Sequence, residues 1–215
     1  MLRLSSSLLA LIAAFAIAAC GSSNKSGAGS QSGGSPAPAG GSVSGGTGTG
    51  NGSGALAADA TSAATGDIPD TQNFLTLNAS KAGFAMLYPE GWTIRESASS
   101  ASIADKNNLV RIVVVKGAAP TTASVGAELA KLEQSTQGLK ATAPQTVTVK
   151  SGPAVKATYT TVSAPNPVTG KQIKLTVDRY VLAHQGRTAT VDLGTPVGVD
   201  NVDAYRKMIE SFKWR

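Results

Sequence analysis

The sequence predicts an α+β fold, in which an antiparallel β-sheet is flanked by helices as an α/β/α sandwich. Three observations predict it. Apolar segments follow the order strands, helix, strands, helix; breaker-rich turns join consecutive strands; and both helical segments carry an apolar stripe. Short connections between consecutive strands require antiparallel pairing. The predicted domain covers residues 67–215, which is long enough for one compact core.

The first strands are expected at residues 73–77, 83–89 and 92–96. The stretch "YPEG", from Tyr88 to Gly91, fits a type I turn with Pro second and Gly fourth, so it should join the last two of these strands as a hairpin. Trp92 follows directly. Because the flanking apolar residues alternate to one face, we expect Trp92 to be a buried peg rather than an exposed ligand contact. Trp92→Ala should then cost roughly 3–5 kcal/mol of stability.

The segment "NLVRIVVVKG", residues 108–117, is the most apolar strand. Apolar residues occupy both faces of this strand, which predicts that both are covered near its centre. A helix is expected over residues 124–138, with Ser124 as the N-cap and Gly138 as the stop. Its apolar stripe consists of Val125, Leu129 and Leu132.

The remaining strands are expected at 145–150, 154–163, 171–185 and 187–195. Gln185-Gly186 should join the last two as a tight hairpin. The last helix is expected over residues 200–212, capped by Asp200 and with Asp203 at its positive end. Its apolar face would consist of Val202, Tyr205, Ile209 and Phe212, and Phe212 and Trp214 would close the core.

The N-terminal residues read as an export signal. Arg3 precedes an apolar run over residues 8–17, which is shorter than the roughly 20 residues of a transmembrane helix. "IAAC", from Ile17 to Cys20, resembles the bacterial lipobox. Residues 1–19 are therefore predicted to be a lipoprotein signal peptide, and Cys20 the site that receives the lipid. Two or three acyl chains anchor a protein stably, whereas one is marginal.

Residues 20–66 form a Gly/Ser-rich segment, and 14 of the 24 glycines lie here. Such a segment buries too little apolar surface to offset its ordering entropy, so we expect a disordered tether. As a coil it would span on the order of 35–40 Å root-mean-square. With Cys20 lipidated, the domain has no cysteine for a disulfide, a metal site or a nucleophile.

The domain carries a net charge of about five positive units, because Arg3, Lys25 and Asp59 lie outside it. The bases are spread along the sequence and few aromatic residues accompany them, so no nucleic-acid partner is predicted. A mild attraction to anionic lipid or wall polymer is the most that this charge implies.

Few residues could carry catalysis. The one histidine, His184, lies beside the Gln185-Gly186 turn, where a solvated side chain is the common case. Asp178 and Asp192 lie on neighbouring predicted strands, nearly opposite one another, and could form either a catalytic pair or an ion-pair cluster with Arg179 and Arg187.

Metal ligands are equally sparse. Asp200 and Asp203 could form a weak cation site, although helix capping explains them better. No metal site and no cofactor is predicted.

The stretch "GFAMLYPEGW" near the start of the domain and the terminal helix ending "IESFKW" resemble the PsbP-like family. The resemblance covers about residues 73–215 and implies an α/β/α sandwich with a binding or assembly role that is mostly non-enzymatic. Together with the lipobox and the tether, it points to the bacterial lipoprotein branch of that family, of the LpqN type. No family site residues transfer.

The function expected is that of a lipoprotein anchored through Cys20 to the outer face of a bacterial cell membrane. Its domain would be a non-enzymatic binding or accessory module that contacts an envelope protein, a lipid or a wall polymer. Two alternatives stay open. One is a small envelope hydrolase that uses Asp178, Asp192 or His184, and the other is a spacer lipoprotein without a specific ligand.

Overall fold

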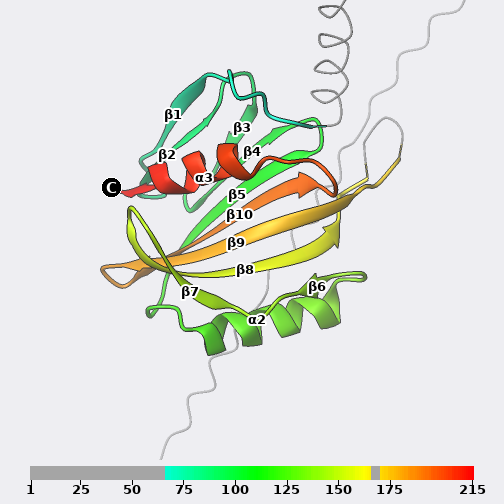
Figure 1. The fold of residues 1–215 in the computed structure, drawn as a ribbon. Helices are drawn as coiled ribbons and strands as arrows, with labels where there is room; N and C mark the ends of the chain where they lie inside the picture. Colours follow the sequence, from blue (N-terminus) through cyan, green and yellow to red (C-terminus); the bar gives the residue numbers. More distant parts are fainter. Residues whose placement is uncertain (1–65, 166–169) are drawn as a thin grey trace, which may run out of the picture. The chain divides into compact units, whose positions relative to one another are not determined.

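A computed structural model describes residues 66–165 and 170–215 of the chain (Figure 1). The predicted signal peptide, Cys20 and all of the predicted tether except Gly66 lie outside these residues. Among the residues described, no helix is both long and apolar enough to pass through a membrane. The strands and helices are β1 (Phe74–Ala79), β2 (Phe84–Pro89), β3 (Thr93–Glu96), β4 (Ser100–Asp105), β5 (Asn108–Lys116), α2 (Thr122–Ser135), β6 (Lys140–Ala141), β7 (Gln145–Val149), β8 (Gly152–Val162), β9 (Lys174–His184), β10 (Arg187–Pro196), α3 (Val202–Ser211) and β11 (Lys213–Trp214).

The strands form two sheets. The small sheet has the order β1-β2-β11, and the large sheet has the order β3-β4-β5-β10-β9-β8-β6, with β7 also paired to β8. Every pairing among these strands is antiparallel, as the short connections predict. Gln185 and Gly186 join β9 to β10 with φ angles of 48° and 71°, the positive values that a type I′ turn requires.

The two helices pack on opposite faces of the large sheet (Figure 1). On one face, Val125 and Leu129 of α2 bury against β8 and β9. On the other, Met208 and Ile209 of α3 join the core shared by the small sheet and the strands β4, β5 and β10. The structure is therefore the predicted α+β fold, an antiparallel sheet with a helix on each face.

The predicted hairpin between the second and third strands is wrong. β2 pairs with β1 and β11 in the small sheet, whereas β3 pairs with β4 in the large one. The turn itself is tight, since Trp92 N donates to Pro89 O at 3.3 Å. Gly91, third in this turn, has a φ of 89°, which is typical of type II rather than type I. The turn thus passes the chain between sheets, and Trp92, 8% exposed, is the predicted buried peg between them.

Strand β5 is buried on one face and only partly covered on the other. Near its centre, where both faces were predicted to be covered, Val113 of the second face is half-buried and Arg111 is exposed. Val110, Ile112 and Val114 are buried in the core, but Leu109 and Val115 on the other face are 38% and 54% exposed. The reason is that α2 lies over β8 and β9 and does not extend across β5. The α2 side of β5 is consequently partly open to solvent.

The helix termini differ from the predictions by a few residues. The N-cap of α2 is Thr121, which forms a capping box with Ser124, so Ser124 is the third helical residue. The helix ends at Ser135, and Gly138 takes a positive φ in the turn that follows. In α3, Val202 is 60% exposed instead of buried, and the apolar face consists of Tyr205, Met208, Ile209 and Phe212.

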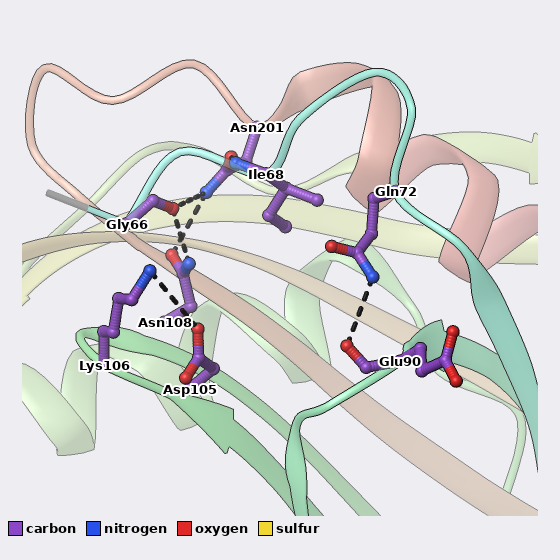
Figure 2. A network of polar contacts seen from close by, with 8 residues as sticks. All are labelled: Gly66, Ile68, Gln72, Glu90, Asp105, Lys106, Asn108 and Asn201. Carbon is purple, nitrogen blue, oxygen red and sulfur yellow. Dashed lines mark hydrogen bonds and ion pairs between the residues drawn. The ribbon is translucent and has the colours of Figure 1, made fainter. Parts of the chain in front are cut away.

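Two buried amide side chains secure the start of the described chain (Figure 2). Asn108 Nδ2 and Asn201 Nδ2 both donate to Gly66 O, and Ile68 N donates to Asn201 Oδ1 at 2.8 Å. The amides also contact each other, with Asn201 Nδ2 3.1 Å from Asn108 Oδ1. The first described residue, Gly66, is thus bound to both β5 and the start of α3.

Candidate functional site

Two hollows open on opposite faces of the large sheet, over the same central strands β8, β9 and β10. We call them the α2-side hollow, of about 250 Å³, and the α3-side hollow, of about 320 Å³. Each contains an acidic residue that the sequence singled out, Asp192 in the first and Asp178 in the second.

The α2-side hollow has apolar walls and a charged end. The walls are Leu109, Leu132, Leu139, Val162, Leu175 and Val177. Arg111, Tyr159, Arg179 and Asp192 form the polar end, and the hydroxyl residues Thr136, Thr161 and Ser163 also belong to the lining. Helix α2 covers β8 and β9 but not β5. The exposed side of β5 and the C-terminal turns of α2 therefore form the two sides of one groove.

Arg179 and Asp192 form a buried bidentate ion pair at the charged end. Arg179 Nε and Nη2 donate to the two carboxylate oxygens of Asp192 at 2.7 and 2.9 Å, and Arg179 Nη1 donates to Glu128 Oε1 at 2.9 Å. Burial disfavours the charged guanidinium, but the hydrogen bonds and the charge of Asp192 outweigh it and raise the pKa of Arg179 above its ordinary value. Arg179 also lies 5.3 Å from the ring centre of Tyr159.

Arg111 differs from Arg179, although both approach the same aspartate. Its Nη2 atom lies 3.7 Å from Asp192 Oδ2, and its side chain is 55% exposed. Asp192 is already bound in bidentate fashion by Arg179, so Arg111 retains donors that face solvent at the mouth of the groove. Burial, followed by the charge of Asp192, raises the pKa of Tyr159 to about 12, so this phenol is neutral at ordinary pH.

The α3-side hollow is more polar. Lys156 Nζ lies 2.8 Å from Asp178 Oδ2, and Thr158 Oγ1 donates to Asp178 Oδ1 at 2.6 Å. Lys156 Nζ also lies 5.2 Å from the ring centre of Tyr180. Burial lowers the pKa of Lys156, but the hydrogen bond and charge of Asp178 outweigh this and raise it overall. Both side chains of the pair are about one-third exposed, at 31% and 32%.

Asp178, Asp192 and His184, the residues of the alternative hydrolase hypothesis, do not come together. In the register of β9 and β10, Asp192 lies opposite Arg179, and Asp178 lies opposite Leu193. Neighbouring residues of a strand point to opposite faces, so the two aspartates are separated by the sheet. His184 lies six residues along β9 from Asp178, which is roughly 20 Å at the rise of a strand. Its side chain is exposed and stacks on Trp214, with 5.9 Å between the ring centres. The ion-pair interpretation is correct for Arg179 with Asp192, whereas Asp178 pairs with Lys156 and Arg187 lies elsewhere.

The N-cap of α3 is Asn201 and not the predicted Asp200, and the Asn201 side chain forms no capping bond, whereas Asp203 lies in the first turn as predicted. Asp200 Oδ1 accepts from Val202 N at 3.2 Å, and Asp203 Oδ1 accepts from Arg206 Nη1 at 3.1 Å. Within residues 66–165 and 170–215, no three His, Cys, Asp or Glu side chains lie in an arrangement suited to a metal ion. The lipidation site predicted at Cys20 lies outside the described residues.

Sequence reasoning missed the residues that give each hollow its character. Arg111 is the base in the interior of the apolar strand β5, and Lys156 is the one base of the Thr-rich strand β8. A base inside such a strand is the signal that could have identified each of them. Tyr159 lies two residues after Ala157 and four after Val155, so the alternation of a strand places all three on the same face. The sequence therefore indicates the face of Tyr159 but not the ion pair beside it.

No protein-family model matches the sequence, and no curated protein matches it significantly. Solved structures do share features of its fold. One is cyanobacterial PsbP (CyanoP) from Synechocystis sp., with 14% identity and a TM-score of 0.48 over 70% of this chain and 98% of that one. Another is the Ran-binding protein Mog1p of Saccharomyces cerevisiae, with 8% identity and a TM-score of 0.48 over 67% of this chain and 96% of that one.

LpqN of Mycobacterium tuberculosis, a protein involved in cell envelope biogenesis, is 15% identical to this chain. The TM-score is 0.39, over 67% of this chain and 91% of LpqN. The chain is thus similar to structures of the PsbP/Mog1-like fold, LpqN included, at low sequence identity. The similarity is one of fold, and the site above is described from this chain's own residues.

Proposed function

We propose that this protein is a lipoprotein anchored through Cys20 to the outer face of a bacterial cell membrane, with a non-enzymatic domain that binds a ligand in the α2-side hollow. The anchor is supported by the sequence "IAAC" after a short apolar run. Cys20→Ala should release the protein from the membrane fraction or leave the precursor unprocessed. Normal processing with unchanged membrane fractionation would contradict the anchor.

The observation that carries the binding role is the chemistry of the α2-side hollow. It joins an apolar groove to the exposed guanidinium of Arg111. Its volume of about 250 Å³ exceeds the roughly 150 Å³ of an engineered apolar cavity that holds benzene. A ligand with an apolar body and one anionic group fits these walls, since leucine and valine side chains would contact its body and Arg111 its anion.

Binding is favoured over catalysis because the buried charges of the groove already serve one another. Both oxygens of Asp192 accept hydrogen bonds from Arg179, and the third described donor of Arg179 is held by Glu128. A general base needs a lone pair within reach of the proton that it removes. Asp192 presents its oxygens to Arg179 instead, which suits a rigid support for the groove.

The test uses octanoate, a simple anion with an apolar body, observed by NMR on the mature chain. Octanoate should shift the amide signals of β5 and of the C-terminal turns of α2 in a saturable way. Arg111→Gln should weaken this binding by about 10-fold or more, since a charge-assisted hydrogen bond contributes roughly 1.5–3 kcal/mol. Arg206, 66% exposed on α3, provides the matched control. Equal weakening by Arg206→Gln, or shifts spread over the whole domain, would contradict the site.

A further inference from the structure

The fold gathers basic residues at one end of the large sheet. Lys116 at the end of β5 lies opposite Arg187 at the start of β10, and Arg187 lies opposite His184 at the end of β9. Partners in an antiparallel register point to the same face. Gly117 N also donates to Gly186 O at 3.0 Å, which holds the end of β5 beside the β9–β10 turn. Lys116, which is far in the sequence from His184 and Arg187, is therefore brought into one row with them.

The C-terminal strand adds to this row. Arg187 lies over the ring of Trp214, 5.1 Å from its centre, while Arg187 Nη2 donates to Arg215 O at 3.0 Å. His184 stacks on the same tryptophan. Lys213 precedes Trp214 and is exposed. Trp214 is thus half-buried among cationic side chains.

The turn between β1 and β2 completes the cluster. Gly83 of this turn lies so close to Arg187 that a side chain at Gly83 would collide with Nη1 of the arginine. Lys81 stands two residues earlier and is exposed. We call this surface the basic end, made of Lys81, Lys116, Arg187, Lys213 and Arg215.

Within the described part of the chain, none of these five bases forms an ion pair with an acidic side chain. Glu210 is the acidic residue nearest along the chain to Lys213, and its Oε2 atom accepts from Lys150 N at 2.9 Å. Like charges on directly opposite strand positions, such as Lys116 and Arg187, destabilise a sheet. Among the described residues, Arg187 is held by the Trp214 ring and by Arg215 O, but no acidic side chain offsets the charge of the row. The positive charge that remains favours an external anionic partner.

We propose that the basic end binds the anionic lipid headgroups of the membrane that carries the anchor. The proposal rests on the proposed function for its location, since the lipid on Cys20 would keep that surface near the domain. A basic surface with a half-buried tryptophan among its cations matches the interfacial pairing of aromatic and cationic groups. A lipid chain together with a basic patch is also a combination that anchors a protein stably.

The geometry of the chain permits this contact. The described chain begins beside Asn108, and Lys116 lies at the other end of the same strand, β5. Figure 1 shows the C-terminus and the β9–β10 turn on the side of the domain away from this start. Eight residues of strand separate the two ends, which is roughly 26 Å. The predicted tether, with a reach on the order of 35–40 Å, is long enough to run back along the domain to the same membrane.

The test measures the binding of residues 20–215, carrying Cys20→Ser and no acyl chain, to lipid vesicles. This chain keeps every described contact, since all of them lie within residues 66–215. It should bind vesicles containing phosphatidylglycerol and not vesicles of phosphatidylcholine alone, and binding should weaken as salt rises. Brominated phosphatidylglycerol should quench the fluorescence of Trp214.

Matched triple variants separate the basic end from net charge. Replacing Lys81, Lys116 and Lys213 by Gln should lower the vesicle partition coefficient on the order of 100-fold, because each base near an anionic surface contributes about 1 kcal/mol. Replacing Lys131, Lys140 and Lys174 by Gln removes the same charge from exposed positions elsewhere and should change it by less than about threefold.

Equal losses in the two triple variants, or no preference for phosphatidylglycerol, would overturn the proposal. Binding to soluble polyphosphate with no binding to vesicles would also overturn it, in favour of a wall-polymer partner. These outcomes leave the anchor standing, because the chain tested has no lipid, whereas the Cys20→Ala fractionation tests the anchor alone.

Discussion

The two hollows lie on opposite faces of the same three strands, and each contains an aspartate paired with a base, yet the two pairs differ in kind. Arg179 and Asp192 are 3% and 8% exposed and share two hydrogen bonds. Lys156 and Asp178 are about one-third exposed and share one contact at 2.8 Å. Adjacent positions along one strand therefore create two environments, because the side chains at 178 and 179 point to opposite faces.

The difference follows from what covers each face. Helix α2 contributes Glu128 to the buried pair, so the guanidinium is held on several sides and the pair is removed from water. Helix α3 leaves Lys156 and Asp178 open to solvent. The buried pair therefore supports the fold and the wall of the groove. The exposed pair contributes little to the stability of the fold, and its side chains are available to contact a ligand.

The largest effect should come from removing one partner of the buried pair. Asp192→Ala leaves Arg179 buried with Glu128 as its remaining carboxylate partner, and should cost about 3–5 kcal/mol of unfolding free energy in urea denaturation. The double variant Arg179→Met with Asp192→Leu should recover most of this loss, since apolar residues of similar size replace buried ion pairs well. A loss of less than about 1 kcal/mol of unfolding free energy in Asp192→Ala would contradict this, because it would show that the buried pair contributes no more than an exposed ion pair.

A pH effect should follow from the two buried tyrosines. Folding raises the pKa of Tyr159 from about 10 to about 12, so its contribution to stability is complete below pH 10 and is lost as the pH rises through 12. Two pKa units correspond to about 2–3 kcal/mol. Tyr205, on the α3 side, also has a raised pKa, because of its burial.

Tyr159→Phe should therefore flatten the decrease of unfolding free energy between pH 10 and 12, compared with the unchanged chain. Tyr205→Phe should flatten it as well, although it also removes the hydrogen bond of 2.6 Å from Tyr205 Oη to Gly194 O. Urea titrations at each pH measure both slopes. A slope that neither variant changes would show that the phenols do not control the high-pH loss.

The exposed pair should matter least among the ion pairs. Asp178→Asn should change the unfolding free energy by less than about 1 kcal/mol, because solvent screens a pair with one-third of each side chain exposed. Measured beside Asp192→Asn in the same buffer, it gives the contrast between the faces directly. Equal losses of unfolding free energy in the two isosteric variants would show that the two ion pairs do not differ in their contribution to stability.

The smallest effect on stability is expected at Arg111. Its side chain is 55% exposed and its contact with Asp192 is long, at 3.7 Å, so Arg111→Gln should shift the unfolding free energy by no more than about 0.5 kcal/mol. Its effect on octanoate binding should nevertheless be large. A strongly destabilised variant would mean that Arg111 belongs to the buried pair and not to the mouth of the groove.

Local sequence signals predicted the helices, most strands and the β9–β10 hairpin. The Gln185-Gly186 turn fixes the register, and with it the contact between Arg179 and Asp192. The same turn-based reasoning failed at Pro89-Glu90-Gly91, because a tight turn that changes sheets has the same residues as one that closes a hairpin. Strand β4 was not predicted because most of its residues are small or polar and carry little periodic signal. Strands β6 and β11 were not predicted because two residues are too few to show a period.

The candidate sites were less accessible to sequence reasoning than the fold. Which half of the sheet α2 covers depends on packing, so the exposure of Leu109 and the groove beside it could not be predicted from β5 alone. The basic end has the same origin. Lys81, Lys116 and Lys213 are isolated in the sequence, and only the pairing of distant strands and turns places them together.

The two amides that hold Gly66 have a mechanical consequence. Gly66 O accepts from Asn108 of β5 and from Asn201 at the start of α3, so the first described residue is bound to two elements at once. β5 lies inside the large sheet, between β4 and β10, and not at its edge. Detaching Gly66 therefore requires breaking hydrogen bonds to an interior strand and to a helix together, whereas a residue bound to an edge strand alone could be peeled away step by step.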